Sequence, residues 1–154
     1  MDVTTLVQGK ARAAREAARL LALCSTRTKN EALQQMARGL EEKTAAILEA
    51  NRADLERTRA TGATRAFLDR LTLTDARIEA MATGLREIAA LPDPVGETVD
   101  AWRRPSGIEI ARVRVPLGVI GFIYESRPNV TADAAGLCVK SGNYTLSLHD
   151  ALPI

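Results

Sequence analysis

A short polar turn contains the residues of this sequence whose types could do chemistry together. It runs from Glu125 to Asn129, includes Ser126 and Arg127, and follows an apolar run at residues 117–124. The apolar run predicts a strand buried on both faces of a parallel sheet, and the residues after the turn predict a helix. Ligands bind at the carboxyl ends of such strands, and a helix N-terminus favours an anion. The turn is therefore a candidate site for a carboxylate, a phosphate or a developing oxyanion.

The glycines beside this turn do not by themselves indicate a nucleotide. Gly118 and Gly121 lie inside the apolar run, so they lack the position and spacing of the dinucleotide fingerprint, and the sequence has no Walker-type phosphate loop. We expect both glycines to permit close backbone packing. On residue types alone the signal for chemistry is weak, because most polar turns bind nothing. The unit could equally be an anion-binding domain without chemistry.

Cys24 and Cys138 are the two thiols of the sequence. Two cysteines this far apart do not form a disulfide framework, and neither has a second cysteine or a histidine at metal-ligand spacing. Cys138 falls among apolar residues of the predicted helix, so we expect a buried structural thiol, and we expect Cys24 to pack at a helix end. These features predict no metal site and a reducing, cytoplasmic compartment.

Helices are expected to lead up to the site, because apolar residues recur at helical spacing over residues 1–91. Ser25 or Thr26 is placed to cap the second helix and Thr74 the last, before Pro92 ends it. The predicted segments are residues 6–23, a segment with Leu33, Met36, Ala37 and Leu40 on one stripe, a segment with Ile47, Leu48 and Leu55 that stops near Thr61-Gly62, a short apolar cluster at Phe67, Leu68 and Leu71, and residues 75–91.

Strand spacing begins at residues 108–115, where apolar and polar residues alternate with a change of phase that predicts a bulge or a change of strand near Ala111-Arg112. After the buried strand, Asn129 or Thr131 is expected to cap a helix that ends at residues 141–143. The predicted fold class is therefore α/β, with N-terminal helices leading into a strand–turn–helix unit.

Composition limits the possible partners. The 154 residues are 46% hydrophobic and 26% charged, with a net charge of +2, as is typical of globular chains. Basic and acidic residues are interleaved, so no nucleic-acid partner is expected. The longest uncharged apolar run, residues 115–124, is about half as long as a membrane-spanning helix, so no membrane partner is expected either.

Residues 112–131 resemble the hallmark segment of the γ-glutamyl phosphate reductases, a family of the aldehyde dehydrogenase superfamily. The resemblance covers residues 5–143 in order and is most specific over residues 116–143. It implies that the chain is the N-terminal part of such an enzyme, with the first strand–turn–helix of a Rossmann-like cofactor domain, truncated before the catalytic cysteine. Shorter upstream matches are residues 68–71, 85–86 and 93–96.

The resemblance also implies a reaction and a set of roles. In this family a cysteine thiolate displaces phosphate from γ-glutamyl phosphate, and NADPH then reduces the thioester to glutamate 5-semialdehyde on the route to proline. Arg127 aligns with the oxyanion asparagine of the superfamily and Asn129 follows closely, so both are expected to contact the oxyanion or the substrate. Tyr124, Glu125 and Ser126 are expected near the cofactor. The family further implies a homo-oligomer that works with glutamate 5-kinase.

Residues 144–154 differ in character from residues 1–143, because they contain no Lys or Arg and hold the single histidine. They resemble a translated sequencing adapter, so we expect a non-native tail after the helical region and the start of the cofactor domain, which are residues 1–143. His149 and its neighbours Asp150 and Ser147 are therefore not taken as a catalytic triad. Because the family's nucleophile is not expected in this chain, we expect the chain alone to be inactive.

A reading from another class is a small helical interaction module whose working surface is residues 1–91. This reading predicts a self-sufficient fold and a protein partner. Against it, the strand at residues 117–124 has no expected neighbour in the sheet, although its backbone N–H and C=O groups need one.

Overall fold

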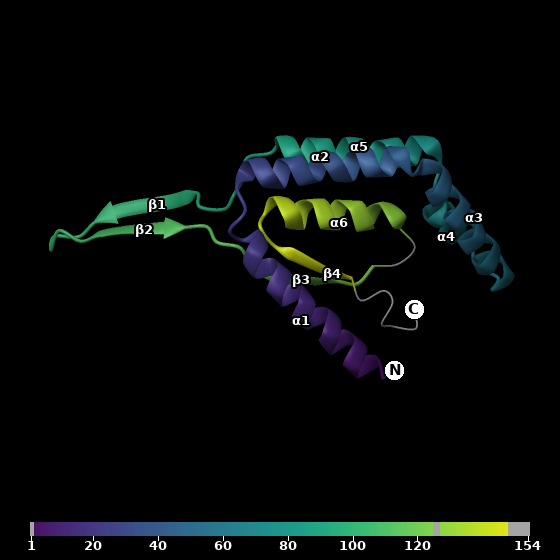
Figure 1. Cartoon of the computed structure of the whole chain (residues 1–154), viewed down its shortest axis with the longest axis horizontal. Helices are drawn as coiled ribbons and strands as arrows, with labels where there is room; N and C mark the ends of the chain where they lie inside the picture. Colours follow the sequence, from purple (N-terminus) through teal and green to yellow (C-terminus); the bar gives the residue numbers. More distant parts are fainter. Residues whose placement is uncertain (1, 125–126, 148–154) are drawn as a thin grey trace.

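The computed structural model describes residues 2–124 and 127–147. In Figure 1, α2 and α5 lie side by side, α6 lies next to them, and a small sheet of β3 and β4 lies between α6 and α1. A hairpin of β1 and β2 extends from one end of the molecule, and α3 and α4 lie at the other end. The helices are α1 (Val3–Leu21), α2 (Thr26–Glu42), α3 (Thr44–Ala60), α4 (Arg65–Leu71), α5 (Asp75–Ala90) and α6 (Pro128–Lys140), and the strands are β1 (Thr98–Arg103), β2 (Glu109–Val113), β3 (Val119–Phe122) and β4 (Tyr144–Ser147).

The predicted N-terminal helices are confirmed, and side-chain caps account for where two of them start. The Ser25 hydroxyl accepts a hydrogen bond from the Thr28 N–H at 3.1 Å, so Ser25 rather than Thr26 caps α2. The Thr74 hydroxyl accepts from the Arg77 N–H at 3.2 Å and caps α5. These caps satisfy N–H groups that a helix start otherwise leaves unpaired.

The core lies where α2, α5 and α6 meet. Its buried side chains come from all three helices: Leu33, Ala37, Met81, Ala82, Leu85, Ala89 and Ala132. Most are small, so the helix axes approach closely. At Gly136 an added Cβ would lie 2.7 Å from Leu85 Cδ2 and 3.0 Å from Ile88 Cδ1, so with a larger residue these side chains or α6 itself would have to shift.

The hairpin was only half predicted. β2 confirms the strand spacing after Ile108, but its antiparallel partner β1 was missed, because all six β1 residues are exposed and show no apolar alternation. The register shifts between Thr98 and Asp100, so the irregularity lies on β1 and not at Ala111-Arg112 as predicted. A strand with one buried face shows alternating apolar and polar residues, and β1 lacks this alternation because both of its faces are exposed.

The second sheet corrects two expectations. β3 pairs in parallel with β4, with Val119 opposite Tyr144, so the expected parallel geometry is confirmed, whereas the expected lack of a sheet neighbour is wrong. Burial on both faces is also wrong, since β3 is partly exposed and Leu117 beside it is 85% exposed. Within the described residues this sheet has only the two strands β3 and β4, which is too few to bury β3 on both faces. The first four residues of the predicted tail form β4, while residues 148–154 lie outside the described part of the chain.

Asn143 joins the start of β3 to the end of α6. It is 5% exposed, its Oδ1 accepts from the Gly118 N–H at 2.8 Å, and the Tyr144 N–H donates to the Gly118 carbonyl at 2.8 Å. Gly118 has a φ of +110° and no close neighbour for a Cβ, so its role is backbone conformation and not the close packing we predicted. α6 ends as predicted at residues 141–143, with the Asn143 N–H bonded to the Cys138 carbonyl at 2.8 Å.

Candidate functional site

α6 begins one residue before the predicted cap. Arg127 is its N-cap residue and Pro128 its first residue, and no side chain caps this end, so the prediction of an Asn129 or Thr131 cap is wrong. Proline fits the first helical position because the N–H that it lacks would have no partner inside the helix. In the part of the chain that the structure describes, no side chain accepts from the backbone N–H groups of the first turn of α6, which is the positive end of the helix dipole.

The structure brings the two predicted oxyanion or substrate contacts to one groove. Arg127 and Asn129 are both exposed and line a groove of about 480 Å³ between α4, the first half of α5 and the start of α6. Asn129 Nδ2 donates to Asp133 Oδ2 at 3.2 Å, which leaves the second amide hydrogen for a ligand. Within the described chain, the Arg127 guanidinium has no hydrogen-bond or ion-pair partner.

The residues predicted near the cofactor are not gathered in this groove. Tyr124 is half-buried between β3 and α6, and its hydroxyl shares a 2.6 Å hydrogen bond with Thr131 Oγ1. Tyr124 is not among the residues that line the groove. Glu125 and Ser126 lie outside the described residues.

One wall of the groove is held by Arg77, which the sequence did not single out. Its Nη1 donates to the carbonyls of Asp69 and Thr72, each at 2.6 Å, and its Nη2 lies 3.3 Å from Asp69 Oδ1. These bonds close the connection between α4 and α5. The segment at residues 68–71, which matches the family, contains Asp69, the ion-pair partner of Arg77.

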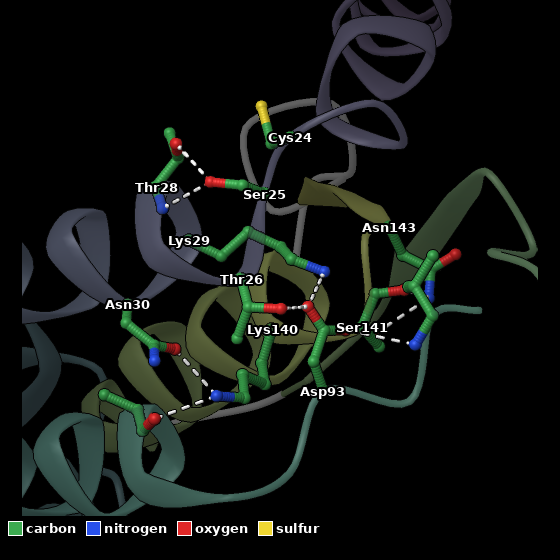
Figure 2. A network of polar contacts seen from close by, with 12 residues as sticks. Cys24, Ser25, Thr26, Thr28, Lys29, Asn30, Asp93, Lys140, Ser141 and Asn143 are labelled. Carbon is green, nitrogen blue, oxygen red and sulfur yellow. Dashed lines mark hydrogen bonds and ion pairs between the residues drawn. The ribbon is translucent and has the colours of Figure 1, made fainter. Parts of the chain in front are cut away.

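A buried polar cluster lies at the opposite end of the same helices (Figure 2). Lys29 Nζ lies 2.5 Å from Asp93 Oδ2, with the two side chains 1% and 10% exposed, and the Thr26 hydroxyl donates to the same oxygen at 2.8 Å. Lys140 Nζ donates to Asn30 Oδ1 at 2.7 Å and to the Ala89 carbonyl at 2.8 Å. The cluster ties the start of α2 to the ends of α5 and α6, and so fixes the helix whose other end carries Asn129.

Charge balance inside the cluster shifts two pKa values. Burial acts to raise the pKa of Asp93, but hydrogen bonds from Lys29, the Val95 N–H and Thr26 outweigh it and hold the pKa below its ordinary value. Burial lowers the pKa of Lys140, although Asp93 acts in the opposite direction. Sequence reasoning missed this cluster. The available signal was Lys29, which extends the apolar stripe of α2 one turn before Leu33.

Cys138 behaves as the sequence predicted. It is 2% exposed, and burial raises the pKa of its thiol even though a hydrogen bond with Thr145 acts the other way. Cys24 is half-buried just after α1, with its Sγ 3.5 Å from the Leu20 carbonyl, which agrees with packing at a helix end. A buried, protonated thiol is a poor nucleophile.

The described residues form neither a metal site nor a membrane-spanning helix. In residues 2–124 and 127–147, no three His, Cys, Asp or Glu side chains are grouped so that they could hold a metal ion. No helix in the same part of the chain has both the length and the apolar character needed to cross a bilayer.

Comparison with known proteins gives a consistent result. The γ-glutamyl phosphate reductase of Moorella thermoacetica is 62% identical over 143 residues, which are 93% of this chain and 34% of that protein. That of Syntrophomonas wolfei is 60% identical over 146 residues, which are 95% of this chain and 34% of that protein. The chain thus spans about a third of the length of the curated relatives it matches. No protein-family model matches the chain.

Solved structures match the fold over the same extent. The crystal structure of γ-glutamyl phosphate reductase from Thermotoga maritima superposes with a TM-score of 0.89 at 48% identity, covering 92% of this chain and 34% of that one. The structure of the Saccharomyces cerevisiae protein of that name gives 0.87 at 34% identity, covering 92% and 36%. The helices, the hairpin and the parallel strands of this chain therefore have the same arrangement as in those two structures.

Proposed function

Since the chain belongs to the γ-glutamyl phosphate reductase family over the part of the family's length that it spans, we propose that it contributes to the NADPH-dependent reduction of γ-glutamyl phosphate to glutamate 5-semialdehyde and phosphate in proline biosynthesis. The observation that carries this proposal is the meeting of Arg127 and Asn129 in one groove at the uncapped start of α6. Both residues can donate N–H hydrogen bonds to an oxygen that gains negative charge.

The proposed role of these residues is to stabilise charge at the reacting carbonyl. When a thiolate adds to the acyl phosphate carbon, the carbonyl oxygen becomes an oxyanion, and phosphate then leaves with its bonding electrons. Hydride addition to the resulting thioester makes a second oxyanion at the same oxygen. The Arg127 guanidinium and the second amide N–H of Asn129 are the donors in reach of such a group, and the α6 dipole favours it too.

For the cofactor, the described residues fit one part of a dinucleotide. Tyr124 is fixed at the end of β3 by its bond to Thr131, where its ring offers a flat, partly apolar surface, and the uncapped start of α6 suits an anionic group. We assign Tyr124 to this contact and retain Glu125 and Ser126 as predictions. NADPH would supply the hydride, and NADP specificity is part of the proposal.

Neither cysteine of the chain suits the nucleophilic role. Cys138 is buried with a raised pKa, and Cys24 lies at the junction of α1 and α2, away from the groove residues. We therefore propose that this chain alone does not catalyse the reaction and that another part of the complete enzyme supplies the thiolate. The unpaired state of both thiols supports our assignment to a reducing cytoplasm.

The proposal includes a homo-oligomer that works with glutamate 5-kinase. Support for the oligomer comes from the β1–β2 hairpin, which extends from the body of the molecule (Figure 1). Large apolar side chains on and beside this hairpin are exposed. Val99 is 48%, Trp102 40% and Ile108 61% exposed. Such an arm gains stability when a second subunit covers it. We do not retain the helical interaction module, because the match to the relatives runs through helices and strands alike.

The test is a chimera in which residues 1–143 of this chain replace the matching third of the Thermotoga maritima reductase. The assay follows the reverse reaction, the phosphate- and NADP-dependent oxidation of glutamate 5-semialdehyde. We expect Asn129→Ala to lower kcat by roughly 10²–10³-fold, as loss of an oxyanion donor does. Arg59→Gln, an exposed substitution on α3, is the matched control. Unchanged kcat in both Asn129→Ala and Arg127→Ala would contradict the proposed site.

A further inference from the structure

The Asn129 amide, which the proposed function makes an oxyanion donor, is held by a second residue of the groove. Asp133 follows it by one turn of α6, and Asn129 Nδ2 donates to Asp133 Oδ2 at 3.2 Å. Both residues line the same groove. Residues four apart lie on the same face of a helix, so the contact is built into α6 itself.

Asn129 needs such a contact because the two ends of an asparagine amide have opposite chemistry. The NH2 group donates and the carbonyl oxygen accepts, and turning the amide over exchanges their positions. Asn129 is exposed, and among residues 2–124 and 127–147 its amide has no hydrogen-bond partner other than Asp133. Without that partner the amide would spend part of its time with the carbonyl oxygen in the place where a donor is required.

An ionised carboxylate allows only one of these two orientations. It accepts hydrogen bonds and cannot donate them, so Asp133 attracts the NH2 group and repels the amide oxygen. The two N–H bonds of an amide lie in one plane at a fixed angle, so a bond from one of them to Asp133 also fixes the direction of the other. A donor whose direction is set beforehand stabilises an oxyanion without the cost of reorientation during the reaction.

The surroundings of Asp133 suit this role. It is half-buried on the second turn of α6, and its Oδ1 lies 3.9 Å from the place that a Cβ would occupy at Gly84 on α5. The absence of a side chain at Gly84 leaves room for the carboxylate. In the part of the chain that the structure describes, no cationic side chain pairs with Asp133, so no stronger partner draws the carboxylate away from Asn129.

We propose that Asp133 is a positioning residue, which orients the Asn129 amide so that its second N–H is directed at the reacting oxygen. The proposal rests on the proposed function, which makes Asn129 a donor to that oxygen. Asp133 itself does not touch the substrate. Because it acts through Asn129, its effect on the reaction exists only while Asn129 is present.

The sign of the effect on kcat separates positioning from charge. A carboxylate near a developing oxyanion repels it, so removing Asp133 would raise kcat if charge were its only influence. Loss of positioning lowers kcat instead. We therefore expect Asp133→Ala to lower kcat by about threefold to tenfold, the range that corresponds to the net strength of one hydrogen bond. Asp133→Asn keeps an acceptor oxygen and should lose less.

A double-mutant cycle in the chimera with the Thermotoga maritima reductase is the experiment. The kcat is measured for Asn129→Ala, for Asp133→Ala and for the double variant. Asp100→Ala on β1, exposed and outside the groove, is the matched control and should keep the parent kcat. If Asp133 acts through Asn129, the double variant should have the kcat of Asn129→Ala alone. Effects that multiply, or an unchanged or raised kcat in Asp133→Ala, would overturn the inference.

The same cycle distinguishes the two proposals. If Asn129→Ala lowers kcat as expected while Asp133→Ala has no effect, the proposed function stands and the positioning role of Asp133 is excluded. If neither Asn129→Ala nor Arg127→Ala lowers kcat, the proposed function fails and the positioning role fails with it.

A second readout uses the ¹⁵N-labelled chain and needs no activity. The side-chain amide of Asn129 gives two hydrogen signals, and the hydrogen bonded to Asp133 should exchange with water more slowly than the other. Asp133→Ala should reduce this difference, and Asp133→Asn should keep part of it. The Asn143 amide, which donates to the Ser141 hydroxyl at 2.9 Å, is the internal control and should not change. An exchange difference at Asn129 that is the same in the parent and in Asp133→Ala would overturn the inference.

Discussion

At one end of the layer formed by α2, α5 and α6, Lys29 and Lys140 are buried, the Asp93 side chain is 10% exposed, and each of the three has partners. At the other end, Arg70 and Arg127 are exposed beside an open groove and have no partner in the described residues. Burial of a charge is costly unless it is paired, so the first end must be complete within the chain in order to fold. Exposed charges carry no such demand and remain available to a ligand. The same three helices thus have one end that holds the fold together and another end that we propose as the binding end.

The largest effect is expected from breaking the buried pair. Lys29→Met leaves the Asp93 carboxylate in its buried position without its main cation, and should lower the free energy of unfolding by about 3–5 kcal/mol. Urea denaturation measures it. Arg27→Gln on the same helix, whose partner Glu31 is 64% exposed, is the control and should cost less than about 1 kcal/mol. Equal losses in the two variants would show that the cluster is not a structural centre.

A smaller loss of stability is expected from a substitution that disturbs the close contact of α5 and α6, midway between the two ends of these helices. Gly136→Ala places a Cβ 2.7 Å from Leu85 Cδ2, so side chains or α6 must shift, at a cost of about 1–3 kcal/mol. Ala is the better helix former, so an exposed site would gain stability instead. Gly39→Ala on α2, where an added Cβ meets nothing within 4 Å, is the matched control. A gain in stability at Gly136 would contradict the close approach of α5 and α6.

The buried end should also respond to pH. The folded-state pKa of Asp93 lies below its unfolded value of about 3.9, so its contribution to stability is full above that value and is lost as pH falls through the folded pKa. The free-energy difference between the parent and Asp93→Asn should therefore shrink as pH is lowered from about 5 toward 2. Urea denaturation across that range measures it. A difference that stays constant with pH would exclude a depressed pKa.

The smallest effect on stability is expected at the binding end. Arg70→Gln and Arg127→Gln should each change the free energy of unfolding by no more than about 0.5 kcal/mol, because both side chains are exposed and neither guanidinium has a partner among residues 2–124 and 127–147. Thermal and urea unfolding of the two variants test this. A loss above about 2 kcal/mol would mean that these arginines hold the fold together, and the contrast between the two ends would disappear.

The sequence by itself determined the local structure and the family. The caps at Ser25 and Thr74, the stripe from Leu33 to Leu40 and the stop at Gly142 act through neighbours along the chain, so their effect can be read from spacing alone. The buried state of Cys138 followed from its apolar neighbours in the helix. The prediction of Arg127 and Asn129 as site residues came from motif resemblance and stays a prediction, and both residues line one groove in the structure.

Only the tertiary structure decided which distant residues meet. Lys29 and Asp93 are separated in the sequence by three helices. The position of Lys29 on an apolar stripe is explained only by the Asp93 carboxylate, which the fold brings next to it. Local sequence pattern likewise did not predict the partner strand β4, the exposed hairpin strand β1 or the groove that α4 shares with the start of α6. Contacts between segments far apart depend on how the helices pack, and packing is set by side-chain volume and close approach at positions such as Gly136, which no single stretch of sequence contains.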